Sequence, residues 1–273
     1  MTLSTSEISR RNHVKVLPGA GPALLYAHGF GCNQTMWSRI TPAFQATHQQ
    51  VLFDYVGSGQ SDLAAFDPEK YSGLSGYAQD VIDVCDALEL KDVIFVAHSV
   101  SCSIGMLASM ARPDLFRTMV LVGPNPCFLN HPPDYMGGFE ASDLEGLLDL
   151  MDQNYIGWAN YLAPVVSSAG SAMGDAAVTA ELSDSFCSTD PTAARVFARA
   201  TFFADNRADL EKVTCPSLIL QHRTDALAPF KVGEYLHQRL TGSRLEILEV
   251  HGHCAHMSHP ELVVAAMRTF LKQ

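Results

Sequence analysis

The stretch from Lys91 to Pro113 most constrains how this chain can fold; it reads KDVIFVAHSVSCSIGMLASMARP. Residues 93–96 are apolar and mostly β-branched, with no polar face, which is typical of a strand buried on both sides of a parallel sheet. From Val100 the pattern changes to small and apolar residues at helical spacing, and Pro113 ends it. We therefore predict that a buried strand and a helix meet at a sharp turn, with Ser99 at its apex.

A strand, tight turn and helix in this order form a nucleophile elbow, in which a strained turn raises a serine hydroxyl above the edge of the sheet. The usual pattern has glycine two residues before and two residues after the serine, because strand and helix cross closely there. This chain has Ala97 and Ser101 at those positions, and both are small. The alternative is that Ser99 only caps the helix. The buried strand, the helix and suitable partners downstream favour a nucleophile.

The composition limits the class of protein. A chain of 273 residues with 47% hydrophobic residues can bury a large core, and we expect one domain over residues 1–273. The 29 acidic residues exceed the 18 lysines and arginines, which gives a formal charge of -11. That charge repels nucleic acid and anionic membrane surfaces, so we expect neither as a partner.

The cysteines and the N-terminus indicate a compartment. Seven scattered cysteines, an odd number, are not typical of a disulfide framework and suit a reducing environment. The first residues, MTLSTSEISRRNH, contain no apolar signal region, and no apolar run approaches the length of a membrane span. We expect a soluble, cytoplasmic protein.

A glycine-rich loop, HGFG at residues 28–31, follows a predicted strand at 23–27 and precedes a predicted helix at 36–44. In a hydrolase with a nucleophile elbow, this loop supplies one backbone N–H to the developing oxyanion, and the residue after the nucleophile supplies the other. Those donors would be Phe30 and Val100. The Phe30 side chain is then free to form one wall of an acyl pocket. The alternative is that the two glycines only permit a turn.

A second loop, DYVGSGQSD at residues 54–62, contains two glycines and two aspartates. We reject a phosphate-binding loop, because the lysine of a P-loop is missing and no helix begins at the glycines as in the dinucleotide fingerprint. Asp54 is predicted to be a structural acid that accepts hydrogen bonds from loop amides near the site.

Strands and helices alternate up to a strand at residues 118–122, and the alternation resumes with a strand at 217–221. Between them, helix-like stretches follow one another with breakers in between. This pattern predicts a helical cap, at about residues 128–206, inserted into a mostly parallel twisted sheet that is flanked by helices. The four helix-like stretches are 144–151, 156–162, 176–186 and 191–203.

The cap segment is rich in aromatic residues, and most of these must pack the cap helices against one another and against the body. A minority will face a ligand. We expect substrate contacts from Phe30, Phe128, Phe139, Trp158 and Phe202.

An acid and a histidine complete the predicted chemistry. Asp225 lies in the loop just beyond the strand at 217–221, where a triad carboxylate is expected; a surface aspartate or a helix cap is the alternative. His253 follows a glycine directly after the last predicted strand, where the base belongs in the order serine, acid, histidine. His251 and His256 are the fallback candidates.

The run from His251 to His259 contains four histidines and a cysteine, and zinc accepts such ligands. No second group of ligands accompanies this run in the sequence, so we expect neither a metal nor another cofactor.

Together these residues predict an α/β-hydrolase fold and a serine hydrolase. His253 would accept the proton of the Ser99 hydroxyl, Asp225 would hold the imidazole, and an acyl-enzyme would form on Ser99. A covered apolar pocket favours a small hydrophobic carboxylic ester or a lactone over a peptide or a polysaccharide.

Several motifs also resemble one branch of this fold. They are SRRNHV, FDYVGSGQSD, GYAQDVIDVCDAL, HSVS, GPNPCFLNHPPDYMGGFE, NYIGWA, FCSTDP and GHCAHMSHP. They extend over nearly the whole chain, including the cap, and are similar to the RsbQ-type bacterial stress regulators and the related plant strigolactone and karrikin receptors. The resemblance implies the triad Ser99, Asp225 and His253. Ala97 departs from the glycine of that family, which bears on elbow geometry and turnover.

The resemblance also implies a function of a different class. The bacterial regulators act in an energy-stress pathway with a partner phosphatase, and the plant receptors hydrolyse a butenolide slowly while changing shape to recruit partners. The alternative to a metabolic esterase is therefore a ligand sensor with slow or single-turnover hydrolysis that acts through a protein such as a PAS-domain phosphatase. The residues alone leave both functions open.

Overall fold

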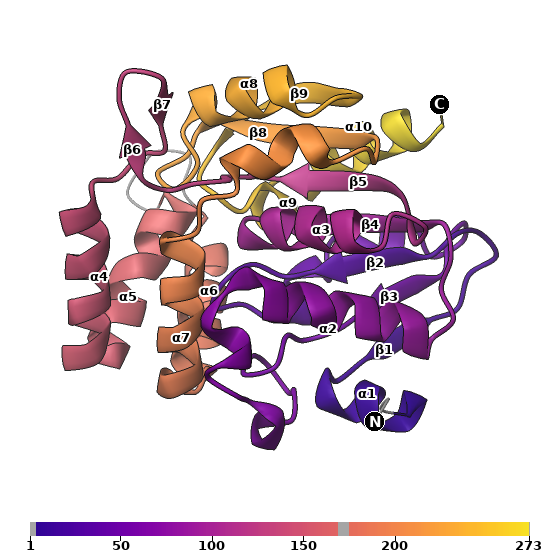
Figure 1. The fold of residues 1–273 in the computed structure, drawn as a ribbon, viewed down its shortest axis with the longest axis horizontal. Helices are drawn as coiled ribbons and strands as arrows, with labels where there is room; N and C mark the ends of the chain where they lie inside the picture. The colour runs from indigo at the N-terminus through magenta and orange to yellow at the C-terminus, as the bar shows by residue number, and fades with distance from the viewer. Residues whose placement is uncertain (1–3, 169–174, 273) are drawn as a thin grey trace.

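The computed structural model describes residues 4–168 and 175–272 of the chain. The strands of its main sheet are β1 (Lys15–Leu17), β2 (Leu24–Ala27), β3 (Gln50–Leu52), β4 (Val93–His98), β5 (Phe116–Val122), β8 (Ser217–Thr224) and β9 (Ser243–His251). Their order in space is β1-β3-β2-β4-β5-β8-β9. β1 runs antiparallel to β3, and every other neighbouring pair is parallel (Figure 1). The predicted α/β-hydrolase fold is confirmed.

The central strand β4 is buried at every position, and its side chains alternate between two cores. Val93, Phe95 and Ala97 belong to the core on one face of the sheet, and Ile94 and Val96 belong to the core on the other face. This alternation explains why the stretch has no polar face: a parallel sheet covered on both sides leaves none of its residues in water.

Helices cover both faces of the sheet (Figure 1). The helices of the body are α1 (Thr5–Arg11), α2 (Leu74–Ala87), α3 (Val100–Ala111), α8 (Phe230–Arg239), α9 (Ala255–Ser258) and α10 (Pro260–Leu271). A Cβ atom on Gly105 of α3 would lie 2.3 Å from the Phe95 ring, so glycine is needed for α3 to pack this closely on β4. None of the helices described is long and apolar enough to cross a membrane.

A cap of four helices in the described chain lies between β5 and β8, beyond the carboxyl ends of the strands (Figure 1). The cap helices are α4 (Ala141–Gln153), α5 (Tyr155–Ser167), α6 (Ala176–Ser188) and α7 (Pro191–Phe202). The predicted cap is therefore present. Its predicted span of about 128–206 includes residues 169–174, which lie outside the described residues.

Two local features differ from the sequence prediction. The helix expected at 36–44 is replaced by two short 3-10 helices, Gln34–Trp37 and Thr41–Ala43. Pro42 explains the break, because proline has no N–H and its ring clashes with the preceding turn of an α-helix. The cap segment also begins with an unpredicted hairpin of β6 (Asn130–His131) and β7 (Tyr135–Met136). Three further 3-10 helices are Leu63–Ala65, Lys70–Ser72 and Arg207–Lys212.

Candidate active site

Ser99 forms the turn between β4 and α3 in a strained conformation, with φ 56° and ψ -122°. Residues other than glycine rarely adopt a positive φ, and such strain persists only where the surrounding structure imposes it, often at functional sites. The Ser99 N–H donates to the carbonyl of Val122 in β5 at 2.9 Å, which fixes the turn to the neighbouring strand. The sharp turn expected from the sequence is present.

The two residues that replace the usual glycines of the elbow are both accommodated. The Ser101 hydroxyl donates to the His28 carbonyl at 2.5 Å and lies 3.0 Å from the Tyr55 hydroxyl. The Cys102 thiol of α3 contacts the Ala97 carbonyl at 3.5 Å. The larger side chain at 101 therefore gains hydrogen bonds in the space that a glycine would leave.

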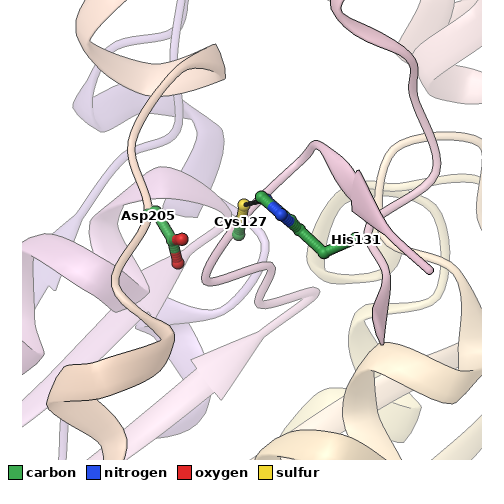
Figure 2. Close-up of side chains that lie close together, drawn as sticks. All are labelled: Cys127, His131 and Asp205. Carbon is green, nitrogen blue, oxygen red and sulfur yellow. Dashed lines mark hydrogen bonds between the residues drawn. The ribbon is translucent and has the colours of Figure 1, made fainter. Parts of the chain in front are cut away.

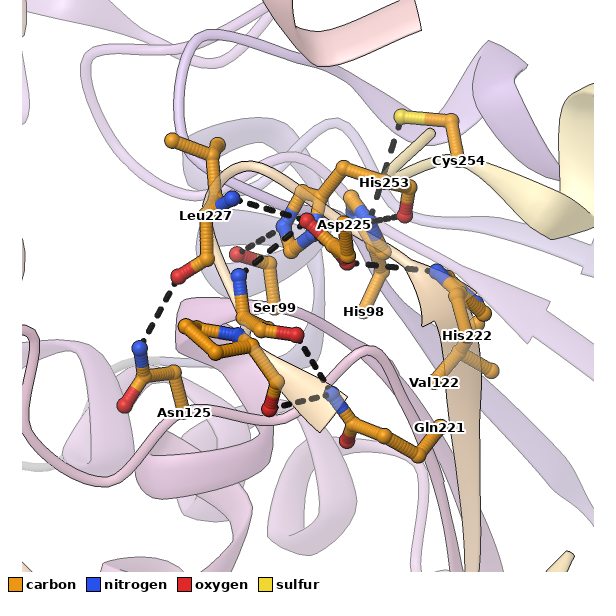
Figure 3. Close-up of polar contacts among 12 residues, drawn as sticks. His98, Ser99, Val122, Asn125, Gln221, His222, Asp225, Leu227, His253 and Cys254 are labelled. Atoms are coloured by element: carbon orange, nitrogen blue, oxygen red, sulfur yellow. Dashed lines mark hydrogen bonds and ion pairs between the residues drawn. The ribbon is translucent and has the colours of Figure 1, made fainter. Parts of the chain in front are cut away.

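Ser99, His253 and Asp225 form a continuous chain of hydrogen bonds (Figure 3). Ser99 Oγ lies 2.7 Å from His253 Nε2, and His253 Nδ1 lies 2.7 Å from Asp225 Oδ2. The three residues follow β4, β9 and β8, whose carboxyl ends meet at one edge of the sheet, and all three are buried. In open α/β sheets, ligands bind at this edge.

The fallback histidines lie elsewhere. His251 is the last residue of β9 and pairs in register with Thr224. His256 lies in α9, where its ring packs against Trp37 at 4.6 Å and against His98 at 4.5 Å between centroids. Burial lowers the pKa of both His98 and His256 well below the usual value, so both rings are neutral at pH 7. Among the described histidines, His253 is the one whose ring forms the hydrogen bond with the Ser99 hydroxyl.

The carboxylate of Asp225 accepts hydrogen bonds at both oxygens. Oδ1 accepts from the N–H groups of Leu227 at 2.8 Å and Ala228 at 3.1 Å. Oδ2 lies 2.7 Å from His253 Nδ1 and 3.2 Å from His222 Nδ1. Burial by itself raises the pKa of Asp225, but the charge and hydrogen bonds of His253 and His222 outweigh burial and hold this pKa far below its usual range. Asp225 is therefore ionised at neutral pH.

His222 is a neighbour of the site that the sequence analysis missed. It is fully buried at the end of β8, and its only sequence signal was its position three residues before the acid. With Asp225 and His253 it also forms a group whose potential metal-ligand atoms lie within 4.8 Å of one another. The potential ligand atoms of this group already form hydrogen bonds with one another and with Ser99, so we assign no metal to the group.

The glycine-rich loop touches the elbow directly. A Cβ atom on Gly29 would lie 2.5 Å from His98 Nδ1 and 3.5 Å from Ser99 Cβ, so glycine allows a close approach rather than only a turn. Phe30 follows Gly29 in this loop. Val100 is the first residue of α3, where an N–H group has no acceptor within the helix. The two amides expected to bind an oxyanion thus belong to the segments that flank the Ser99 side chain.

Asp54 holds the loops behind the site. Its Oδ1 accepts from the N–H of Gln34 at 2.8 Å, and its Oδ2 accepts from the N–H of Gln60 at 2.9 Å. The prediction that Asp54 is a structural acid that binds loop amides is confirmed.

A narrow, mostly apolar pocket lies over Ser99 beneath the cap. Its cavity volume is only about 20 Å³. That is room for about one water molecule. Predicted residues in its wall are Phe30, Phe128 and Phe202, and unpredicted ones include Leu162, Val166, Phe186, Thr201 and Leu227.

Two predicted pocket residues lie behind the wall instead of in it. Among the described residues that line the pocket, neither Trp158 nor Phe139 is present. Trp158 is fully buried, with its ring 5.9 Å from Phe30 between centroids, and Phe139 lies 6.3 Å from Phe128. These two rings support the aromatic side chains that do face the pocket. In this conformation Trp158 and Phe139 do not line the pocket, and their direct contact with a substrate stays a prediction.

Thr201 is the polar residue that the cap contributes to the pocket wall. It is 2% exposed, and its hydroxyl has no hydrogen-bond partner within the described part of the chain. A buried hydroxyl without a partner costs free energy, which a ligand with a matching polar atom recovers. Thr201 is thus placed to recognise a polar atom in an otherwise apolar ligand.

Comparison with known proteins agrees with the fold. The alpha/beta hydrolase family matches residues 24–266. A hydrolase from Oleispira antarctica superposes with a TM-score of 0.96 at 44% identity, over 100% of this chain and 99% of that one. The karrikin insensitive 2 receptor CA of Petunia hybrida is 37% identical over 95% of each chain. The strigolactone esterase D14 of Arabidopsis thaliana is 34% identical over 98% of this chain and 99% of its own. This chain therefore belongs to the alpha/beta hydrolase family and is related to the plant karrikin and strigolactone receptor esterases.

Proposed function

We propose that this protein is a serine hydrolase that cleaves small hydrophobic carboxylic esters or lactones, with Ser99 as nucleophile, His253 as base and Asp225 as the orienting acid. The observation that carries the proposal is the hydrogen-bond chain of these three residues beneath an enclosed apolar pocket. The strigolactone esterase among its relatives supports the reaction class. All seven cysteines are free thiols in the structure, which supports a reducing, cytoplasmic setting.

The geometry supports a two-step mechanism. His253 Nε2 accepts the proton of Ser99 Oγ as that oxygen attacks the substrate carbonyl. The N–H groups of Phe30 and Val100 hold the tetrahedral oxyanion. His253 then returns the proton to the leaving oxygen, and a water molecule activated by the same imidazole hydrolyses the acyl-enzyme. Asp225 keeps His253 in the required tautomer and stabilises its charged form.

The pocket wall narrows the substrate class. Phenylalanine, leucine and valine side chains favour a compact apolar ligand, and the Thr201 hydroxyl favours one further polar atom in it. A substituted butenolide meets both conditions.

The substitution Thr201→Val keeps the shape of the side chain and removes its hydroxyl. We expect it to lower kcat/KM for a polar lactone about tenfold relative to kcat/KM for a plain alkyl ester, since one hydrogen bond is lost. An unchanged ratio between the two substrates would remove Thr201 from recognition.

A ligand-sensing regulator is the second candidate function, and the narrow pocket favours it. A cavity with room for about one water molecule is too small for an ester, so we expect the cap or the side chains that line the pocket to move when a ligand binds. A partner protein can bind selectively to the ligand-bound conformation, and the relationship to receptors supports this role. The proposed partner is a signalling protein such as a PAS-domain phosphatase. Slow or single-turnover hydrolysis would then determine how long the signal lasts.

Pre-steady-state kinetics with a chromogenic short-chain ester test both functions. We expect wild-type protein to release one equivalent of chromophore in a burst, and Ser99→Ala to show none. A burst followed by very slow release supports the sensor, whereas fast sustained turnover supports a metabolic esterase. Equal hydrolysis by wild type and Ser99→Ala, with both folded by circular dichroism, would exclude Ser99 as the nucleophile.

A further inference from the structure

The chain enters and leaves the cap through two segments that lie side by side, residues 126–131 and 205–207, here called the cap neck. Cys127 and Asp205 pair as an isolated antiparallel bridge, and the Asn206 N–H donates to the Pro126 carbonyl at 2.8 Å. These contacts bring together residues that lie more than 70 positions apart in the sequence.

Three side chains of different donor type converge at the cap neck (Figure 2). They are the thiol of Cys127, the imidazole of His131 and the carboxylate of Asp205, and their potential ligand atoms all lie within 4.8 Å of one another. Cys127 Sγ lies 3.6 Å from His131 Nε2. Cys127 is buried and Asp205 is exposed, so the group opens toward solvent.

The spacing fits one metal ion. With Zn–S at about 2.3 Å and Zn–N at about 2.0 to 2.1 Å, tetrahedral geometry places the sulfur and nitrogen ligands about 3.6 Å apart. The separation of Cys127 Sγ from His131 Nε2 has this value. We propose that Cys127, His131 and Asp205 form a binding site for Zn²⁺, with a water molecule as the fourth ligand.

The surrounding charges are compatible with the ion. Arg207 donates to Asp205 from Nε to Oδ1 at 2.8 Å and from Nη2 to Oδ2 at 2.6 Å. The backbone N–H of Arg207 also donates to Oδ1 at 3.2 Å, so Oδ2 is the oxygen that retains a lone pair for the metal. Outer partners of this kind commonly orient a metal-bound carboxylate. Metal binding replaces the S–H bond of Cys127 by an S–Zn bond and releases one proton to solvent.

A metal at this position joins the segment that enters the cap to the segment that leaves it. Cys127 and His131 belong to the first segment, and Asp205 belongs to the second. The ion therefore restrains the base of the cap without touching Ser99. This role is independent of the proposed hydrolase, and its test does not use catalysis.

Titration of the metal-free protein with Co²⁺ alone tests the site, because a cobalt–thiolate bond gives a charge-transfer absorption band. We expect one equivalent of Co²⁺ to produce this band and Zn²⁺ to abolish it. The other candidate group, at the triad, contains no sulfur, so it cannot give the same signal. No band at a tenfold excess of Co²⁺ over protein would overturn the proposal.

Variants locate the ligands. Cys127→Ser should abolish the band, and His131→Gln should weaken Co²⁺ binding at least tenfold. Cys187→Ser, which changes a partly exposed cysteine of α6, is the matched control and should leave the band unchanged. His131 is at the surface, so its variant decides the question if Cys127→Ser misfolds. A band of full strength in His131→Gln, or a band lost only in Cys187→Ser, would overturn the proposal.

Discussion

Asp80 and Asp225 are both buried aspartates, but their partners differ in kind. Asp80 lies 3.2 Å from Arg11 Nη2 and 2.8 Å from Lys70 Nζ, and it accepts from the Tyr71 hydroxyl at 3.0 Å. Asp225 instead contacts two imidazoles and two backbone N–H groups. The carboxylate of Asp80 is paired with an arginine and a lysine. The carboxylate of Asp225 is paired with imidazoles and uncharged backbone groups.

The difference separates a structural acid from a candidate catalytic one. Arg11 and Lys70 form ion pairs with Asp80, which join α1 and the segment before α2 to helix α2. In the proposed mechanism, the charge of Asp225 stabilises His253 when that imidazole accepts the Ser99 proton. Burial alone therefore does not identify a functional carboxylate, whereas the chemical nature of its partners does.

The largest effect is expected from Asp225→Asn. The amide cannot stabilise a positive His253 or fix its tautomer, so we expect kcat for ester hydrolysis to fall about 10⁴-fold. Steady-state kinetics measure the loss. A fall of less than tenfold would place Asp225 with Asp80 among the structural acids.

Asp80→Asn should lower the stability of the protein and leave its catalysis nearly unchanged. Removing this member of a buried ionic network leaves Lys70 without its carboxylate partner and leaves Arg11 paired with Asp83 alone, a loss of about 3 kcal/mol. Thermal unfolding should show a Tm lower by roughly 10 °C. We expect kcat to stay within about twofold of wild type, because the network lies outside the site. Asp134→Asn changes an exposed acid and serves as the control; an equal Tm shift there would contradict the assignment.

His222 offers a smaller and sharper test. The His222 Nδ1–H donates to the same Asp225 oxygen that binds His253. Removing this donor should therefore strengthen the interaction of Asp225 with the charged imidazole of His253. We expect His222→Leu to change kcat for ester hydrolysis by about two- to tenfold, the size expected for one hydrogen bond. His222→Asn retains a donor near the same position and should keep the wild-type kcat. Equal kcat values for wild type and His222→Leu would mean that His222 only fills space.

The sequence predicted what short segments determine by themselves. The elbow at Ser99 and the apolar strands follow from runs of a few residues, and the predicted strand ends lie within three residues of those observed. The helix expected at 36–44 failed because Pro42 outweighed the helical spacing of its neighbours. That error was local and could have been avoided.

Other features of the site could not have been predicted from the sequence. Whether Trp158 lines the pocket or supports Phe30 depends on how the cap helices rotate against the body. His222 approaches Asp225 because β8 ends there with an irregular register. Both arrangements arise only from packing between distant segments. The same holds for the cap neck.

Gly31 connects the cap to the glycine-rich loop. A Cβ atom there would lie 2.4 Å from the ring of Phe186 in α6, and the Ser185 hydroxyl donates to the Gly31 carbonyl at 2.9 Å. Helix α6 thus rests on the segment that carries the Phe30 amide. A movement of α6 is thus coupled through Gly31 to the loop that contains Phe30, and we expect cap motion to alter the oxyanion site predicted there.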